Sequence, residues 1–395
     1  MGLRIGIVVP HIFMQDIILP NVIFSPGELA LNLANKLIYL GHDVTLFSPG
    51  KVTTRAKNTT VDLGGFEQEL ELRRDSYLGL LKKHPLAFIT LARQAQAELL
   101  KQVFKEANDN ELDIVHIYTN EEELGIIFSD FCKKPVVFTH HDPFNLLAGY
   151  RNIMPRYAHK NWLSISEAQK KSMPADTNWI KTIYNSLDES IWTNKPYKKE
   201  GYVAYIGRII ASKGTHVAIK AVLEYNKRHP TEKLRLKVAG KYYDDSPNSY
   251  WTKYIKPLLD DPYVEYVGFI SEQQEKQAFL SKAKALIIPS IYDEPFGVVM
   301  LEALASSTPL IALDSGALPE LIRNGETGYI VEKELIPTGN LRQEVSESTI
   351  KEMANALENI DLLDPSNCRK AFEDRFTLTH MAEEHVAAYT QLVNQ

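Results

Sequence analysis

The sequence has very few cysteines and no excess of basic residues. Cys132 and Cys368 are its only thiols in 395 residues and lie far apart, which excludes a disulfide framework or a cysteine-based metal site. The 44 Lys and Arg residues against 50 Asp and Glu residues leave a formal net charge of -6. Nucleic-acid binders neutralise phosphates with a surplus of cations. We therefore expect no nucleic-acid partner.

Long apolar segments are also absent. No run is long enough to span a bilayer, and the first apolar run, residues 5–9, ends at Pro10 without a small-residue cleavage site. The basic region of residues 73–101 is interleaved with acidic residues, so no sustained basic face is predicted. These features predict a cytoplasmic protein without an integral membrane segment, and they do not favour peripheral attachment to a membrane.

What the sequence does contain is a repeated alternation of apolar strands and amphipathic helical segments. Two consecutive series of this kind predict an α/β protein with two doubly wound, Rossmann-like domains facing one another across a cleft. We expect an N-terminal domain at residues 1–190, a C-terminal domain at 191–375 and a terminal helix at 376–395, with a linker around residues 185–200. The terminal helix either caps the second domain or crosses back to the first. A long helical region from about residue 77 to 107 is expected to break at Pro85. The expected strands are residues 3–9, 44–47, 114–118, 136–139, 162–165, 202–206, 234–239, 264–267, 285–289, 310–313 and 329–331.

The most informative segment runs from Glu294 to Glu302. Pro295 favours an extended conformation at Glu294, after a strand whose carboxyl end lies where open α/β sheets bind ligands. Gly297 opens a helix, whose first amides attract an anion. Glu302 is a carboxylate in an otherwise apolar run and is costly to bury without a function. Two acceptor groups around an anion site suit a ligand with hydroxyls at both ends and phosphates between, such as a nucleotide sugar.

A second constellation follows the strand at residues 202–206. Arg208 leaves the end of this strand, and Lys213 precedes the glycine that opens the next helix. An arginine fork and a lysine point charge are suited to a diphosphate. At the same sheet edge as Glu294, they would also offset the negative charge that develops on a departing diphosphate.

With these residues the chain resembles glycosyltransferase family 4, which contains retaining enzymes of the GT-B fold. The Glu294–Glu302 spacing is similar to the paired-glutamate motif of that family, and Arg208 and Lys213 are similar to its diphosphate-binding pair. Residues 315–331 resemble the strand and turn elements that follow. In the first half the resemblance rests on Gly27 and on residues 41–44 and 139–142.

The resemblance implies roles for individual residues. Glu294 would contact hydroxyls of the donor sugar, Glu302 would bind the ribose hydroxyls, and Gly240 would lie near the base. Three consecutive residues would supply backbone amides: Phe296, Gly297 and Val298.

The same resemblance extends to the first half of the chain. Residues 25–28 precede the first expected helix, so the amide of Gly27 is predicted to face phosphate. His141 matches the family histidine near the reacting carbon and would contact the transferred sugar or orient the acceptor. We count Glu294, His141, Arg208 and Lys213 as the candidate catalytic residues.

The resemblance implies a retaining hexosyltransferase whose co-substrate is a nucleotide-diphosphate sugar, preferably a uridine diphosphate sugar, with no cofactor and an unidentified acceptor. The family needs no metal, and the sequence has no Asp-x-Asp pair. A GT-B phosphorylase, a nucleotide-sugar epimerase and a non-catalytic nucleotide-sugar-binding protein remain as alternatives, because the same residues would serve each of them. A dinucleotide-dependent oxidoreductase is disfavoured, because no Gly-x-Gly-x-x-Gly follows either opening strand.

Overall fold

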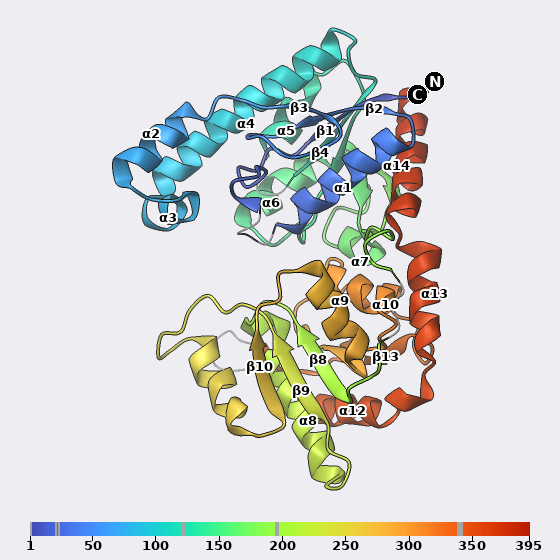
Figure 1. Ribbon diagram of the computed structural model, residues 1–395. Coiled ribbons are helices and arrows are strands. Elements are labelled where there is room, and N and C mark those ends of the chain that lie inside the picture. The colour runs from blue at the N-terminus through green and yellow to red at the C-terminus, as the bar shows by residue number, and fades with distance from the viewer. Residues whose placement is uncertain (1, 20–21, 23, 120–122, 194–196, 338–342) are drawn as a thin grey trace. The chain divides into compact units, whose positions relative to one another are not determined.

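The structure is a computed structural model that describes residues 2–19, 22, 24–119, 123–193, 197–337 and 343–395. The chain divides into two compact units, of which unit 1 comprises residues 1–185 and 378–395 and unit 2 comprises residues 186–377. Each unit is built on a parallel sheet of its own (Figure 1). The predicted α/β class with two parallel sheets is confirmed.

Unit 1 contains, within the described residues, a seven-stranded parallel sheet in the order β3-β2-β1-β4-β5-β6-β7. Its central strands β1 and β4 are almost entirely buried, as expected for a parallel sheet covered on both faces. The strands are β1 (Arg4–Val8), β2 (Asp43–Phe47), β3 (Lys57–Thr59), β4 (Ile114–Tyr118), β5 (Val136–Thr139), β6 (Asn161–Ser164) and β7 (Trp179–Thr182).

Two helices of unit 1, α1 (Ser25–Tyr39) and α4 (Pro85–Asn108), have a proline in their first turn. The predicted break at Pro85 is confirmed, because α3 ends before this proline and α4 begins with it. The helices are α1 (Ser25–Tyr39), α2 (Gly64–Arg73), α3 (Tyr77–Lys83), α4 (Pro85–Asn108), α5 (Leu124–Phe128), α6 (Ala148–Ile153), α7 (Glu167–Lys170) and α14 (Leu378–Val393), with short turns η2 (Ser129–Phe131) and η3 (Met154–Tyr157).

The terminal helix α14 belongs to unit 1 although it is the last element of the chain. It packs against α1, and the hydroxyl of Tyr389 lies 2.6 Å from Nδ1 of His116 on β4. Met381, Tyr389 and Leu392 are buried in the same apolar cluster as Leu33 of α1. The core of unit 1 is therefore assembled from both ends of the sequence.

Unit 2 contains, in its described part, a six-stranded parallel sheet in the order β10-β9-β8-β11-β12-β13 and an antiparallel pair, β14 with β15. The strands are β8 (Tyr202–Ile206), β9 (Arg235–Ala239), β10 (Val264–Gly268), β11 (Ala285–Ile288), β12 (Leu310–Leu313), β13 (Gly328–Val331), β14 (Leu335–Pro337) and β15 (Gln343–Val345). The helices are α8 (Thr215–Arg228), α9 (Gln273–Lys282), α10 (Val298–Ala305), α11 (Leu318–Leu321), α12 (Glu347–Glu358) and α13 (Pro365–Arg375), with short turns η4 (Ala211–Lys213), η5 (Trp251–Ile255), η6 (Lys256–Asp260) and η7 (Ile360–Leu362).

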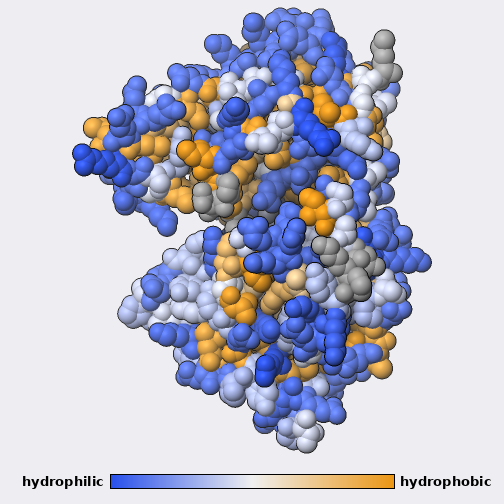
Figure 2. Space-filling view, in the orientation of Figure 1, coloured by the Kyte–Doolittle hydropathy of each residue, from blue (hydrophilic) through white to orange (hydrophobic). Residues whose placement is uncertain are grey.

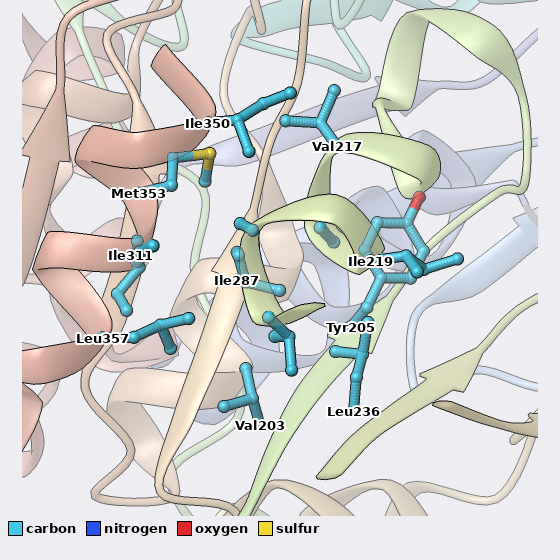
Figure 3. Close-up of a cluster of buried hydrophobic side chains, with 14 of the residues drawn as sticks. Val203, Tyr205, Val217, Ile219, Leu236, Ile287, Ile311, Ile350, Met353 and Leu357 are labelled. Atoms are coloured by element: carbon cyan, nitrogen blue, oxygen red, sulfur yellow. The ribbon is translucent and has the colours of Figure 1, made fainter. Parts of the chain in front are cut away.

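The core of unit 2 lies between its sheet and helices α8 and α12 (Figure 3). Ile287 and Ile311 of adjacent strands meet Val217 of α8 and Met353 of α12 in one buried cluster. This packing leaves the carboxyl ends of β8, β9, β11 and β12 to carry the polar loops described below. On the face in view in Figure 2, polar residues predominate and apolar residues form separate groups.

The sequence prediction missed several elements and misplaced others. The edge strand β3 is polar, helix α2 has no clear apolar face, and β7 and the β14–β15 pair are short, so none produced a strong pattern. The strand expected at 162–165 begins one residue earlier. The linker expected at 185–200 has no helix or strand in its described part, but Leu187 and Trp192 are buried.

Candidate functional site

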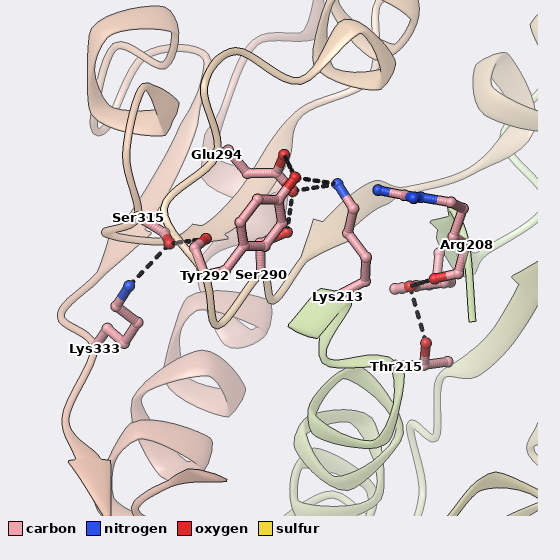
Figure 4. A network of polar contacts seen from close by, with 9 residues as sticks. Arg208, Lys213, Thr215, Ser290, Tyr292, Glu294, Ser315 and Lys333 are labelled. Carbon is pink, nitrogen blue, oxygen red and sulfur yellow. Dashed lines mark hydrogen bonds and ion pairs between the residues drawn. The ribbon is translucent and has the colours of Figure 1, made fainter. Parts of the chain in front are cut away.

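The polar network around Glu294 lies at the carboxyl edge of the sheet in unit 2 (Figure 4). Glu294 follows β11, and Arg208 and Lys213 follow β8, which pairs with β11. Parallel neighbouring strands bring their carboxyl ends to one edge. Gly214 permits this approach, because a Cβ there would lie 2.0 Å from the carbonyl oxygen of Pro289.

The Glu294 carboxylate is buried and fully oriented. Its residue is 5% exposed, and Oε1 accepts hydrogen bonds of 2.5 Å from Lys213 Nζ and from Ser290 Oγ. Oε2 accepts a bond of 2.7 Å from the Tyr292 hydroxyl. A carboxylate offers about four acceptor positions, so these three donors leave capacity for one further donor, such as a hydroxyl of a ligand.

The loop that carries Glu294 is held from the next two strands. The amide of Ala317 donates to the Glu294 carbonyl at 2.8 Å, and a Cβ at Gly316 would lie 2.2 Å from that carbonyl oxygen. Ser315 Oγ donates to the Tyr292 carbonyl and receives a bond from Lys333 Nζ. These supports were not predicted, although Ser315 and Gly316 lie in a segment that the family resemblance had already marked.

Two cations accompany this carboxylate. The Lys213 ammonium has three donors, and its bonds to Glu294 and to the Tyr292 hydroxyl leave one for a ligand. Arg208 is exposed, and its guanidinium makes no hydrogen bond or ion pair with the described residues. In the view of Figure 4 the Arg208 guanidinium points toward the Lys213 ammonium, which contacts Glu294. Lys213 and Arg208 can therefore bind an anion beside the Glu294 carboxylate.

Helix α10 begins next to Glu294. Gly297 is its N-terminal cap with a φ of 104°, and no side chain caps the first turn. A helix N-terminus carries about half a positive charge, which favours an anion. The Phe296 side chain is 1% exposed and belongs to the interior, so only the backbone of Phe296, with those of Gly297 and Val298, is suited to the role predicted for it.

Glu302 lies one helical turn further along α10, about 6 Å from Val298 at the rise of an α-helix. It is buried, and its Oε1 accepts a 2.7 Å bond from Lys276 Nζ of α9. Burial raises the pKa of Glu302, and the Lys276 ammonium opposes that rise. No sequence signal connected Lys276 to Glu302, because they lie on different helices.

Gly240 occupies the end of β9, close to the end of β8. A Cβ at this position would lie 1.9 Å from the carbonyl oxygen of Gly207. The glycine is therefore required for the close approach of two backbone segments at the sheet edge. Its carbonyl accepts a bond from the Tyr266 hydroxyl at 2.9 Å.

Unit 1 contains the two remaining predicted residues, Gly27 and His141. Residues 25–28 do not precede the first helix, as we had expected, but form the first turn of α1. The Gly27 amide donates to the Phe24 carbonyl at 3.1 Å, and a Cβ there would lie 2.6 Å from the Phe24 ring. In this structure the Gly27 amide therefore makes an internal bond, and its contact with phosphate stays a prediction.

His141 is the second residue after β5, in a loop held by Gln169. The Gln169 amide group donates to the carbonyls of His140 at 2.7 Å and of Asp142 at 3.1 Å. His140 is completely buried, whereas His141 retains some exposure and stacks on Tyr118 at 5.3 Å between ring centroids. Burial lowers the pKa of His141 to about 3, so its imidazole is neutral at physiological pH.

The described parts of the chain contain neither a candidate metal site nor a candidate membrane-spanning helix. No group of three or more His, Cys, Asp or Glu residues there could hold a metal ion. No helix among these residues is long and apolar enough to cross a membrane.

The chain is similar in sequence and in fold to known glycosyltransferases. Residues 187–337 match the sequence model of the family described as "Glycosyl transferases group 1". The chain is 24% identical to the putative glycosyltransferase YtcC of Bacillus subtilis (strain 168) over 327 residues, which are 75% of this chain and 78% of that protein.

A second relative matches a shorter part of the chain with higher identity. The glycogen synthase of Mycobacterium tuberculosis (strain CDC 1551 / Oshkosh) is 33% identical over 159 residues, 38% of this chain, and the match spans only 35% of the synthase. Among solved structures, Anabaena Alr3699/HepE in complex with UDP has a similar fold, with a TM-score of 0.66, 18% identity, and coverage of 99% of this chain and 100% of that one.

Proposed function

We propose, from the premise that the chain belongs to the group 1 glycosyltransferases (glycosyltransferase family 4), that it transfers a hexose from a uridine-diphosphate sugar to an acceptor with retention of configuration. The use of a nucleotide sugar as donor follows from this family assignment. The choice of uridine is supported by the UDP bound to the Anabaena protein of similar fold. The hexose and the stereochemistry rest on the family resemblance.

The observation that carries the proposal is the juxtaposition at one sheet edge of an oriented carboxylate and two cations. Glu294 keeps one acceptor position and Lys213 keeps one donor, and the Arg208 guanidinium makes no hydrogen bond or ion pair with the described residues. A ligand with a hydroxyl next to a diphosphate can pair with all three groups at once: the hydroxyl donates to Glu294, and the diphosphate accepts from Lys213 and Arg208. This chemistry matches the sugar and diphosphate of the donor.

In the proposed reaction the bond between the anomeric carbon and the diphosphate oxygen breaks, and an acceptor oxygen bonds to that carbon on the same face. The acceptor proton leaves with the diphosphate. Arg208, Lys213 and the first amides of α10 offset the negative charge that develops on this leaving group. Glu294 holds the sugar hydroxyls, and Glu302 holds the ribose.

His141 is assigned to the transferred sugar in the same proposal. Because its imidazole is neutral, it would act through hydrogen bonding and shape, and it need not remove a proton. Gly240 would admit the base at the end of β9. We infer no direct contact from Gly27, whose amide is already bonded.

The decisive experiment compares Glu294→Gln with the matched control Asp293→Asn. Asp293 is the adjacent carboxylate, and its side chain is 81% exposed. We expect Glu294→Gln to lower transfer or donor hydrolysis by about 100-fold or more, while UDP still raises the melting temperature by mass action. Asp293→Asn should leave both quantities near those of the unchanged protein.

The same assays separate the alternatives. Release of UDP that depends on an acceptor indicates transfer, whereas dependence on inorganic phosphate indicates a phosphorylase. Conversion of the donor sugar without UDP release indicates an epimerase, and a melting shift without turnover indicates a binding protein. Full activity of Glu294→Gln would remove the role proposed for that carboxylate.

A further inference from the structure

A small cavity lies behind His141 in unit 1. Its volume is about 10 Å³, which is the lower limit for one water molecule. It is lined by side chains from the sheet, from the loop after β5 and from α14, among them Tyr118, Thr139, His141, Ser164 and His385. A cavity of this size with several polar walls is suited to a single bound water.

One wall of this cavity carries a polar atom that lacks a partner. His141 Nε2 is buried and has no hydrogen bond with any described residue. Two other polar groups of the wall are already paired, because Thr139 Oγ1 bonds to His116 Nε2 at 2.8 Å and Ser164 Oγ bonds to Thr182 Oγ1 at 2.8 Å. A buried ring nitrogen without a partner is costly, so His141 Nε2 requires one.

His385 of α14 also lines this cavity. Its Nδ1 lies 2.8 Å from the Met381 carbonyl. A carbonyl can only accept, so Nδ1 bears the hydrogen, and Nε2 is the acceptor of the neutral ring. Burial lowers the pKa of His385 to about 4. Two neutral imidazoles therefore line one cavity.

We propose that this cavity binds one water molecule that joins His141 Nε2 to His385 Nε2, and that His385 is a positioning residue for His141. The water donates one hydrogen to His385 Nε2. It then pairs with His141 Nε2 through its oxygen if that nitrogen carries a hydrogen, and through its second hydrogen if it does not. The inference concerns unit 1 alone. Only its kinetic consequence rests on the proposed function.

The physical need for such a contact follows from the way His141 packs. Stacking on Tyr118, with an angle of 11° between the rings, fixes the plane of the imidazole but does not distinguish a ring from the same ring turned over. The χ2 torsion of histidine is broad and roughly two-fold. A hydrogen bond to Nε2 distinguishes nitrogen from carbon and so selects one of the two orientations.

The helix that carries His385 is itself fixed within unit 1. The Tyr389 hydroxyl bonds to His116 Nδ1 at 2.6 Å, and Lys181 Nζ of β7 lies 2.6 Å from Glu384 Oε2. Met381, one turn before His385, is buried in the core. The last helix of the chain therefore offers a rigid support for a residue in the loop after β5.

The first test requires no enzymatic activity. The full-length protein is labelled with ¹⁵N in its histidine rings, and the His141 signals are identified by their loss in His141→Gln. We expect His385→Leu to change the His141 ring shifts and to yield two ring orientations. His385→Gln, which keeps an acceptor, should restore one orientation. Met381→Leu, which changes the same cavity wall without removing a polar group, should have no effect.

The titration of the His141 signals is part of the same measurement. The titratable groups around this ring are His116 and Tyr118 of β4, His140 and Asp142 of its own loop, and His385 of α14. We expect no titration between pH 8 and pH 5 in the unchanged protein. Unaltered His141 shifts in His385→Leu, or a crystal structure at atomic resolution without a water at Nε2, would overturn the proposal.

The second test uses the reaction. His385→Leu should lower kcat by about tenfold with little change in the donor KM, because it loosens His141 and leaves unit 2 intact, and His385→Gln should recover most of that loss. Tyr389→Phe controls for weaker docking of α14. If the ring shifts respond but no sugar is transferred by any variant, the proposed function fails and the water site stands. Equal kcat losses in His385→Leu and His385→Gln would reduce His385 to a purely structural residue.

Discussion

Glu302 shows how one buried charge depends on a residue from another helix. It is 7% exposed in an apolar part of α10, and the Lys276 ammonium supplies its opposite charge. Breaking a buried pair by removing one partner leaves an uncompensated charge and destabilises a protein strongly. The free energy of unfolding should therefore depend on Lys276, and so should binding of the nucleoside.

We predict that Lys276→Met lowers the free energy of unfolding by about 3 kcal/mol at neutral pH. Burial already raises the pKa of Glu302 above 4.5, and loss of the cation raises it further. This loss of unfolding free energy should be smallest below pH 4.5, where Glu302 is protonated in both the folded and the unfolded state. It should grow as the pH rises through the folded-state pKa. Urea denaturation over a pH series measures this difference.

Two controls accompany this prediction. Lys282→Met removes a more exposed lysine of the same helix, paired with Glu200, and should cost no more than about 1 kcal/mol. Adding Glu302→Gln to Lys276→Met should abolish the pH dependence. A deficit of the same size at pH 4 and pH 8 would contradict the pairing argument.

In unit 1, the loop that carries His141 depends on the single residue Gln169. Its amide hydrogens bridge the carbonyls on either side of His141, and its Oε1 accepts from the Ile165 amide at 3.0 Å. We predict that Gln169→Glu, which keeps the acceptor but loses both donors, costs about 2 kcal/mol in unfolding free energy. Sugar transfer should fall while UDP affinity stays unchanged, as measured by calorimetric titration. Gln94→Glu on the exposed face of α4 is the control, and equal effects of the two changes would refute the role of Gln169.

At the scale of elements, the loops after β11 and β12 are joined by a contact that only glycine allows. Gly316 has a φ of 58°, and a Cβ there would meet backbone atoms of Glu294 at 2.2 and 2.5 Å. If residue 316 carried a Cβ, one of the two loops would have to shift, because backbone atoms cannot move aside as a flexible side chain can. The position of the Glu294 carboxylate is therefore determined by the neighbouring loop as well as by its own.

We predict that Gly316→Ala lowers both stability and sugar transfer, whereas Gly325→Ala lowers stability alone. Gly325 also has a positive φ, 78°, but its Cβ would meet nothing within 4 Å. Its substitution should thus cost only the conformational strain of about 1–2 kcal/mol. Thermal unfolding and initial transfer rates compare the two variants. A transfer rate retained in Gly316→Ala would show that the loop contact does not position Glu294.

At the scale of the whole molecule, the chain contains two units with separate apolar cores. The clusters built on α8 and α12 lie in unit 2, and those built on α1, α4 and α14 lie in unit 1. Separate cores favour separate unfolding transitions. A ligand that binds one unit should then stabilise that unit's transition by mass action.

We predict that UDP raises only the calorimetric transition of unit 2, by about 2.7 kcal/mol in free energy at 100 times its Kd. Deleting residues 378–395 should lower the transition of unit 1, because α14 supplies Met381, Tyr389 and Leu392 to its core, and should leave the UDP effect in place. A single transition that responds as a whole to both changes would contradict the separation of the cores.

Local patterns in the sequence determined the strand and helix rhythm and the donor-side motif. Apolar runs marked the buried strands, Pro85 ended one helix and began another, and the spacing of Glu294, Glu302, Arg208 and Lys213 identified a family whose members share it. Such signals are readable because each depends on residues close together in the sequence. The polar edge strand β3 and the short β14–β15 pair lack them, since neighbours in the sheet decide their state.

Only the tertiary structure decided which distant residues support those motifs. Lys276 meets Glu302 from another helix, Gly316 meets Glu294 from another loop, and His385 faces the cavity behind His141 from the end of the chain. It also placed the Gly27 amide in an internal bond. These contacts join residues far apart in sequence, and their spacing follows no local period. They exist only once the two sheets and their helices have packed.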